Sequence, residues 1–293
     1  MKRPELSIVI LNYNTKELLE DCLGSVRKYM DEVPMEVIVS DNSSTDGSPE
    51  MIRKKFPWVK YTEGPNGGFS RGNNRARPLV IGETVLFLNP DTIVRKNVFL
   101  KTVKYLKEHD DVGALTCKLV LPNGRLDKDV RRRFPTPKIA FEHLVLGIDK
   151  NYWYEDIPED VTHEVEAIQG AFFLTRKDIL DKVGWFDEEY FFDGEDIDLS
   201  YQIYKAGYKL IYYPEVEVTH IKGVTKGKVS EWRYKVDPRQ RRKVRLAGVA
   251  SMERFFRKNL WDSHPKAFDY FVVFGINVFK IVRYIKVVFL SSY

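Results

Sequence analysis

The 293-residue sequence predicts an α/β fold, with a mostly parallel, Rossmann-like central sheet flanked by helices and a helical C-terminal extension. Over residues 1–121, short apolar runs alternate with segments that carry apolar residues at helical spacing, which is the pattern of βαβ units. Hydrophobic residues make up 43% of the chain, enough for a sizeable core, so wholesale disorder and a fibrous repeat are excluded. Residues 226–293 are basic and aromatic and are predicted to be helical.

The elements of the first half follow from local patterns. The first helix begins at a capping pattern over residues 14–17, Pro49 stands at the first position of the second helix, and Pro78 ends the third. Buried apolar runs predict strands over 7–11, 36–40, 58–61, 84–88 and 112–121. Helices are predicted after residues 14 and 48 and over 68–77 and 98–108.

The pattern changes after a turn at residues 122–124. Residues 125–160 are predicted to be irregular, with arginines 131–133 either facing an anionic acceptor or lying in a solvated loop. Gly207 is a suitable residue to end the helix before it. Beyond residue 160 we predict a strand (165–174), a helix (176–183), an aromatic and acidic loop (185–193), a helix (195–206) and strands around Pro214 (209–213 and 215–220).

Charge and cysteine usage narrow the class of protein. Lys and Arg number 47 against 42 Asp and Glu, a net charge of +5, and the basic residues gather at 235–258. Cys22 and Cys117 lie in apolar stretches, which indicates buried thiols in a reducing compartment. No signal peptide is visible, and no run of 18 uncharged apolar residues predicts an ordinary transmembrane helix.

Ligands of open α/β sheets bind beyond the carboxyl ends of the strands, so the residues after each predicted strand are candidates. Asn12 follows the first strand without a G-x-G-x-x-G motif, which argues against an oxidoreductase. Asp41 and small polar residues up to Ser48 follow the second strand and suit a base and a ribose, although, taken alone, a plain polar turn with a helix cap is the favoured interpretation.

The residues that follow the third and fourth predicted strands are suited to bind phosphate groups. The glycine-rich run 64–74 could admit an anion at a helix N-terminus, with Arg71 pairing either a phosphate or Asp91, or it could be an ordinary turn. Asp91, in the sequence Asn89-Pro90-Asp91, could hold a divalent cation that bridges two phosphates, or it could cap the following turn.

Two later positions complete the candidate set. Glu195, Asp196 and Asp198 open one helix, where acids either complement the helix dipole or lie beside a substrate hydroxyl or a cation. His220 ends a strand and is either a structural histidine or a third metal ligand.

Each pattern is weak alone, but their order is specific. The succession resembles glycosyltransferase family 2 of the GT-A type, in particular its bacterial rhamnosyltransferase-like members, over about residues 5–225. The resemblance implies a GT-A catalytic domain over 1–225, with a nucleotide-sugar-binding half (1–121) and an acceptor-binding half (122–225), before the extension 226–293. The motifs that carry it are SIVILNYN, SDNSSTDGS, GPNGGFSRGNN, FLNPDT, QGAFFLTR, GEDIDLSYQIYKAGY and VTH.

The resemblance also implies residue roles. Asp196 would be the general base, and Asp91, Asn89 and His220 would meet Mg²⁺ or Mn²⁺ or the diphosphate it binds. Asn89 replaces the first Asp of the family's D-x-D motif, and an amide binds a hard cation more weakly, so metal binding depends mainly on Asp91. Contacts with the nucleotide-sugar would come from Asn12, Asp41, Asp46, Gly68, Arg71, Asn74, Asn89 and Gly170, with Asp41 on the base and the run 169–171 on the acceptor side.

The implied reaction is an inverting transfer of a sugar, L-rhamnose from dTDP-rhamnose being the leading candidate donor and a UDP-sugar the next. The implied acceptor is a glycan hydroxyl, on a lipid diphosphate, in polysaccharide, O-antigen or cell-wall assembly. A sugar nucleotidyltransferase is disfavoured because the first strand is not followed by a glycine-rich loop. A nucleic-acid-binding protein would use the basic block 235–258, but no nucleic-acid motif accompanies it. A catalytically dead binding module is disfavoured because Asp91 and Asp196 are intact.

Residues 268–290 predict an imperfect basic amphipathic helix. Such a helix suits a membrane interface, or it packs on the domain or on another subunit, which leaves the oligomeric state open. We therefore expect a cytoplasmic protein, peripheral on the inner face of the cell membrane. One half of the helix carries Asn277, Lys280, Arg283 and Lys286, the other carries Phe271, Phe274, Val278, Val282, Ile285 and Phe289, and Ile276, Phe279 and Val287 interrupt the polar half.

Overall fold

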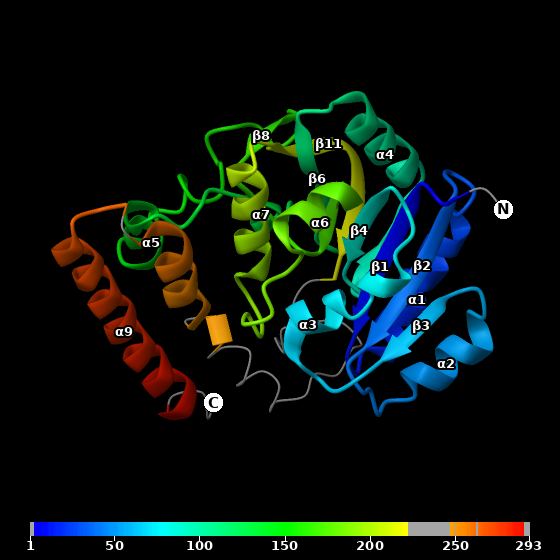
Figure 1. The fold of residues 1–293 in the computed structure, drawn as a ribbon, viewed down its shortest axis with the longest axis horizontal. Coiled ribbons are helices and arrows are strands. Elements are labelled where there is room, and N and C mark those ends of the chain that lie inside the picture. The colour runs from blue at the N-terminus through cyan, green and yellow to red at the C-terminus, as the bar shows by residue number, and fades with distance from the viewer. Residues whose placement is uncertain (1–2, 222–246, 249, 262, 290–293) are drawn as a thin grey trace.

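The computed structural model describes residues 3–221, 247–248, 250–261 and 263–289, and its centre is a nine-stranded sheet flanked by helices (Figure 1). The strands are β1 (Leu6–Asn12), β2 (Met35–Asp41), β3 (Lys60–Glu63), β4 (Thr84–Leu88), β5 (Thr92–Ile93), β6 (Val112–Val120), β7 (Arg131–Arg132), β8 (His163–Val165), β9 (Ala167–Ile168), β10 (Phe172–Arg176) and β11 (Lys209–His220). The helices are α1 (Lys16–Lys28), α2 (Ser48–Lys55), α3 (Gly68–Asn74), α4 (Val98–Glu108), α5 (Pro137–Leu144), α6 (Lys177–Val183), α7 (Glu195–Lys205) and α9 (Lys266–Phe289).

The sheet has the order β3-β2-β1-β4-β10-β6-β11-β5, with β8 paired to β11. Strands β1 to β4 are parallel to one another, and β6 and β11 are parallel to each other. Strand β10 runs antiparallel to both of its neighbours, β4 and β6. The predicted α/β class with a mostly parallel sheet is therefore confirmed.

The core forms where the apolar patterns predicted it. The apolar face of α1, which includes Leu19 and Cys22, is buried against the sheet, as its helical spacing requires. Both cysteines are free and buried, as expected. Burial raises the pKa of the Cys22 thiol to about 12 and also raises that of Cys117, so both thiols are inert.

Six local predictions were wrong. The capping pattern over 14–17 forms no side-chain cap, since Thr15 is the N-cap residue and makes no such hydrogen bond. The helix predicted over 68–77 ends at Asn74, and a 3-10 turn follows at Arg77–Leu79. The strand predicted over 165–174 is three short strands (β8, β9 and β10), because the chain bends at 169–171. The region 125–160 contains the helix α5, which Thr136 caps and Pro137 begins. Strand β11 continues through Pro214, since a register shift between Tyr213 and Glu217 absorbs the proline. The third strand lies at 60–63 instead of 58–61.

The C-terminal part packs against α7 through a small second core. Residues 250–255 are helical and continue into a π-helical turn, Phe256–Leu260, and this helix lies between α7 and α9 (Figure 1). The residues buried there are Phe134, Ala167, Ile197, Phe255, Phe256, Leu260 and Val273. Among the described residues, no helix is long and apolar enough to cross a membrane. Most of the basic block 235–258, up to residue 246, lies outside the described residues.

Candidate active site

The ends of β1 and β2 present a buried amide and a buried carboxylate side by side. Asn12 and Asp41 are register partners in the parallel pair, and Asn12 Nδ2 donates a hydrogen bond to Asp41 Oδ2 at 2.6 Å. The other oxygen, Asp41 Oδ1, accepts the backbone N–H of Ser44 at 2.6 Å. Since both side chains are fully buried and hydrogen-bonded, their positions are fixed before any ligand arrives.

Asp46 lies in the same loop and joins two helices. Its Oδ2 accepts the backbone N–H of Lys16 at 2.8 Å, and its Oδ1 accepts the hydroxyl of Ser48 at 2.6 Å. The carboxylate therefore sits at the N-termini of α1 and α2, where negative charge is favourable.

The residues predicted along the nucleotide-sugar in α3 hold the loop 185–193, which we call the aromatic loop. The backbone N–H of Phe69 donates to Phe191 O at 2.8 Å, and a Cβ added at Gly68 would lie 2.2 Å from that oxygen. Asn74 exchanges two hydrogen bonds with the backbone of Phe186, at 2.8 and 3.2 Å. The aromatic loop is thereby held against α3.

Arg71 does not make the predicted contact with Asp91. Its Nε lies 3.5 Å from Glu188 Oε2 in an exposed ion pair on the aromatic loop. Exposed pairs of this kind contribute little to stability, so the guanidinium can exchange Glu188 for another anion at low cost.

Asp91 and His220 meet because β5 pairs with the end of β11. Thr92 is the register partner of His220, and His220 Nε2 lies 3.4 Å from Asp91 Oδ1. The other ring nitrogen, Nδ1, lies 2.8 Å from Asp127 Oδ2, so the imidazole is held between two carboxylates. Burial alone would lower the pKa of His220, but Asp91 and the hydrogen bond with Asp127 raise it to about 9.

This geometry suits the predicted divalent ion. Asp91 and Asn89 offer hard oxygen donors, and Asp127 orients the histidine ring as carboxylates do behind metal-ligating histidines. Among the described residues, no group of three or more acidic, histidine or cysteine side chains could hold an ion by itself. The residues present therefore fit an ion that takes its remaining ligands from a diphosphate.

The proposed base, Asp196, lies at the start of α7 beside the bend at 169–171. Its Oδ2 accepts the backbone N–H of Gly170 at 3.1 Å and a hydrogen bond from Arg132 Nη2 at 2.8 Å. The side chains of this ion pair are only 10% and 11% exposed. Burial alone would lower the pKa of Arg132, but the Asp196 carboxylate raises it above its ordinary value.

The solvated-loop interpretation of arginines 131–133 was wrong for Arg131 and Arg132. These two side chains are buried. Arg131 donates to the carbonyls of Ile157 and Pro158, and Arg132 pairs with Asp196. Arg133 forms an ion pair with Asp156 at 3.1 Å.

The acids that share α7 with Asp196 differ in their surroundings. Asp198 accepts hydrogen bonds from Lys258 Nζ at 2.7 Å and from Asn259 Nδ2 at 2.8 Å. Asp198 therefore attaches the C-terminal part to α7, which accounts for this acid without a catalytic role.

Sequence reasoning missed two residues of the site, Asp127 and Arg75, and the partner of a third, Arg132. Asp127 becomes a partner of His220 only because the chain turns back after β6, with Asp127 N donating to Leu119 O at 2.8 Å. Arg132 is adjacent to α7 only through the pairing of β7 with β9. Arg75 donates to Asp41 O at 2.8 Å and to Pro65 O at 2.8 Å, and so braces two loops. None of these contacts has a local sequence pattern.

Comparison with known proteins defines the class. The family Glycosyl transferase family 2 matches residues 7–184, more than half of the chain. An N-acetylglucosaminyl-diphospho-decaprenol L-rhamnosyltransferase from Mycobacterium tuberculosis (strain H37Rv) is 28% identical over 241 residues, which cover 76% of this chain and 78% of the relative. Rhamnosyltransferase WbbL from Escherichia coli (strain K12) is 26% identical over 223 residues, covering 73% and 82%.

Solved structures share the fold. The mannosyltransferase PcManGT from Pyrobaculum calidifontis, in complex with GDP-Man and Mn²⁺, is 19% identical with a TM-score of 0.58, covering 98% of this chain and 74% of that one. Staphylococcus aureus TarS 1–349 with UDP is 17% identical with a TM-score of 0.55, covering 97% and 81%.

The chain is thus a glycosyltransferase with the GT-A fold. It belongs to glycosyltransferase family 2 and is a rhamnosyltransferase-like hexosyltransferase.

The attachment of the aromatic loop to α3 depends on Gly68. This residue has φ +92°, and a side chain there would collide with Phe191 O. We expect Gly68→Ala to lower the free energy of unfolding by at least about 2 kcal/mol and to speed protease cleavage within 185–193. Thermal unfolding and limited proteolysis measure both effects. Gly24→Ala in α1 is the matched control, since nothing lies within 4 Å of the added Cβ, and equal behaviour of the two variants would contradict the assignment.

Proposed function

We propose that the protein transfers L-rhamnose from dTDP-rhamnose to a hydroxyl of a glycan carried on a lipid diphosphate, with inversion at the anomeric carbon. The observation that carries this proposal is that Asp41, Asp91, His220 and Asp196 lie along one edge of the sheet, in a chain that is similar to two rhamnosyltransferases. The acceptor is inferred from the name of the M. tuberculosis relative, N-acetylglucosaminyl-diphospho-decaprenol L-rhamnosyltransferase. A UDP-hexose is the second candidate donor.

In this proposal, the residues at this edge of the sheet have two tasks, donor binding and proton transfer from the acceptor. Asn12 and Asp41 bind the nucleoside, with Asp46 close by, and Gly68, Arg71 and Asn74 line the nucleotide-sugar together with the aromatic loop they hold. The acceptor hydroxyl would bind at the bend by Gly170, next to Asp196. Asp196 takes the hydroxyl proton while the acceptor oxygen attacks the sugar carbon and the bond to the diphosphate breaks.

Asp91 and Asn89 would hold Mg²⁺ or Mn²⁺, and His220 would join them as a ligand only by giving up the proton that its two carboxylate partners favour, since metal binding releases protons from its ligands. When bound, the ion neutralises the charge that develops on the departing diphosphate. Asp127 keeps the His220 ring in place for this role.

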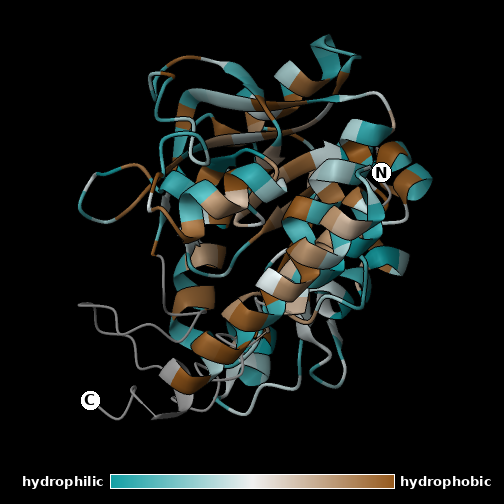
Figure 2. Ribbon diagram, turned by 90° about the vertical axis from the view of Figure 1, so that its left-hand side faces the viewer, coloured by the Kyte–Doolittle hydropathy of each residue, from teal (hydrophilic) through white to brown (hydrophobic). Residues whose placement is uncertain are grey.

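The C-terminal helix α9 supports a membrane-associated acceptor, because most of its predicted apolar face is uncovered (Figure 2). Phe271 and Phe274 are 69% and 66% exposed, and Ile281 is 60% exposed. The helix packs on the body instead through Val273 and the neighbouring Ile276, which explains why an apolar residue interrupts its polar half. An exposed apolar stripe of this kind suits a membrane interface.

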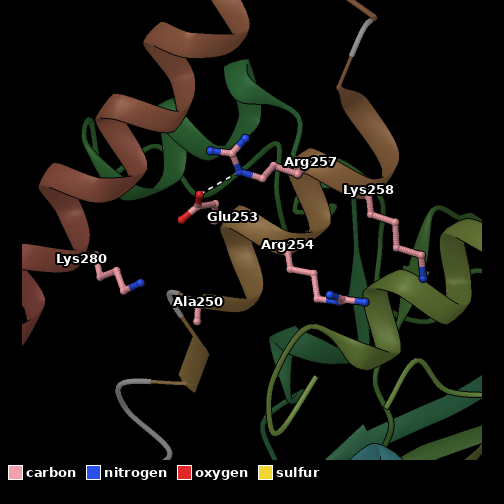
Figure 3. A pocket seen from close by; sticks show the side chains of 6 residues that line it. All are labelled: Ala250, Glu253, Arg254, Arg257, Lys258 and Lys280. Atoms are coloured by element: carbon pink, nitrogen blue, oxygen red, sulfur yellow. Dashed lines mark hydrogen bonds and ion pairs between the residues drawn. The ribbon is translucent and has the colours of Figure 1, made fainter. Parts of the chain in front are cut away.

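The basic side chains near α9 point in two directions, toward the body of the protein or into a pocket beside α9 (Figure 3). A pocket of about 470 Å³ between α9 and the helix 250–260 is lined by Ala250, Glu253, Arg254, Arg257, Lys258 and Lys280. Arg254 and Lys258 point toward the body, where both bind Asp187 at 2.8 Å. Lys280 projects from α9 into the pocket, where it could meet anionic headgroups.

Lys286 and Phe289 lie outside the residues whose side chains are described. We infer a peripheral position on the cytoplasmic face of the membrane, through this extension (226–293).

Donor choice is testable by calorimetry on the full chain. We expect dTDP-rhamnose to bind more tightly than UDP-glucose, UDP-galactose or UDP-N-acetylglucosamine, and Mn²⁺ to strengthen binding at least about tenfold. Asp91→Asn should remove most of the metal effect, because an amide is a weaker ligand for a hard cation. Tighter binding of a UDP-sugar would replace the proposed donor, and failure of every donor and free nucleotide would contradict the proposed function.

The base is tested separately. Asp196→Asn should reduce turnover by at least about a thousandfold while donor binding stays within a factor of about two, because the amide keeps the shape but cannot accept the proton. Asp110→Asn is the control. Its side chain is fully exposed, and it lies just before the start of β6, at the opposite edge of the sheet from the candidate site. A near-normal rate in Asp196→Asn would show that another group takes the proton.

Membrane binding is tested with vesicles that contain phosphatidylglycerol. The triple variant Phe271→Ser, Phe274→Ser, Ile281→Ser should lose at least about tenfold in partitioning, because it removes apolar area that the interface would bury. Ile81→Ser with Leu100→Ser is the matched control, since these residues are 46% and 45% exposed on other elements. Equal partitioning of both variants and the unaltered chain would exclude α9 as the membrane contact.

A further inference from the structure

The proposed base is not a free carboxylate, and its partner comes from a distant part of the chain. Arg132 lies in β7, which forms a two-stranded antiparallel sheet with β9, and Arg132 is the register partner of Ala167. This small sheet carries both the guanidinium and the start of the bend 169–171 to the N-terminus of α7. Arg132 Nη2 also donates to Ile168 O at 3.1 Å, so the guanidinium is anchored at two points.

The two carboxylate oxygens of Asp196 accept different numbers of hydrogen bonds. Oδ2 accepts from Arg132 and from the backbone N–H of Gly170, which together occupy its lone pairs. Oδ1 accepts the backbone N–H of Ile197 at 2.8 Å and keeps a lone pair. Oδ1 is therefore the oxygen that can accept the proton of an acceptor hydroxyl while Arg132 stays in place.

The charge of Arg132 has a second consequence. The Arg132–Asp196 ion pair is buried, and a buried pair is tolerated only while each charge keeps its partner. Loss of the guanidinium would leave the Asp196 carboxylate without a compensating charge.

Besides Asp196, the titratable groups that act most strongly on Arg132 are Tyr152 and Asp129. Burial raises the pKa of Tyr152, so its phenol is neutral and Arg132 is the cation that acts on Asp196. Asp198, on the same helix, is occupied by Lys258 and Asn259.

We propose that Arg132 is a positioning residue for the transfer, which holds Asp196 Oδ2, compensates the carboxylate charge and leaves Oδ1 to receive the proton. The proton passes from the acceptor hydroxyl to Oδ1, the acceptor oxygen bonds to the sugar carbon, and the electron pair of the broken bond leaves with the diphosphate. This inference rests on the proposed function, since it assigns a task within the same reaction.

The full-chain variants Arg132→Gln and Arg132→Lys test it, with Arg133→Gln as matched control because Arg133 is the next residue and pairs with Asp156 instead. The rate is measured across pH with dTDP-rhamnose, or the donor that calorimetry selects, and polyprenyl-diphosphate N-acetylglucosamine. Arg132→Gln should lower kcat at neutral pH at least about tenfold and move the acidic limb of the profile upward by about one pH unit or more, because an uncompensated buried carboxylate takes up a proton more readily. Donor KM should change little.

Arg132→Lys keeps the charge and should restore the position of the acidic limb, with kcat between the other two proteins. Arg133→Gln should leave the profile unchanged. A loss of rate in Arg132→Gln that is equal at every pH would mean that Arg132 only supports the local structure, and would overturn the inference.

A second measurement does not depend on activity. Thermal unfolding of the unaltered chain, Arg132→Gln, Asp196→Asn and the double variant forms a double-mutant cycle. A decrease in Tm for the double variant clearly smaller than the sum of the single decreases supports the pair, and additive decreases contradict it. If the cycle shows coupling but no donor or acceptor is used, the proposed function fails while the Arg132–Asp196 pair stands.

Discussion

Strand β10 is hydrogen-bonded between β4 and β6 and runs opposite to both. Its first residues therefore lie at the edge where β1, β2 and β4 end, and the bend 169–171 that precedes it reaches the same edge. This single reversal brings Gly170 beside Asp196 while Asn12 and Asp41 lie at the ends of neighbouring strands. A wholly parallel sheet would place the start of this strand at the opposite edge.

The aromatic loop is held from two sides, and each side belongs to a different part of the molecule. On one side α3 binds it through Gly68 and Asn74. On the other, Arg254 of the C-terminal part binds Asp187 at 2.8 Å, and the pKa of Asp187, which burial alone would raise, is lowered to about 2 by Lys258 and Arg254. The helix 250–260 therefore lies between α9, the proposed membrane contact, and the aromatic loop.

Much of the fold and of the candidate site could be predicted because both follow local rules. Buried runs and helical spacing located the main strands and helices, and the rule that ligands bind at carboxyl ends selected Asn12, Asp41 and Asp91. The failures have two causes. The bend at 169–171 and the continuation of β11 through Pro214 are decided by pairing with distant strands, which local patterns do not predict. The helix α5, in contrast, has local start signals in Thr136 and Pro137 that the prediction of an irregular region overlooked.

The sequence by itself determined which residues follow each strand, and hence the composition of the site edge and its family. Tertiary structure alone decided the partners: Asp127 for His220, Arg132 for Asp196, and Lys258 for Asp198. Each of these pairs joins residues far apart in the chain, and each forms because a buried charge must find a compensating group wherever the fold supplies one. That requirement is satisfied in space rather than along the chain.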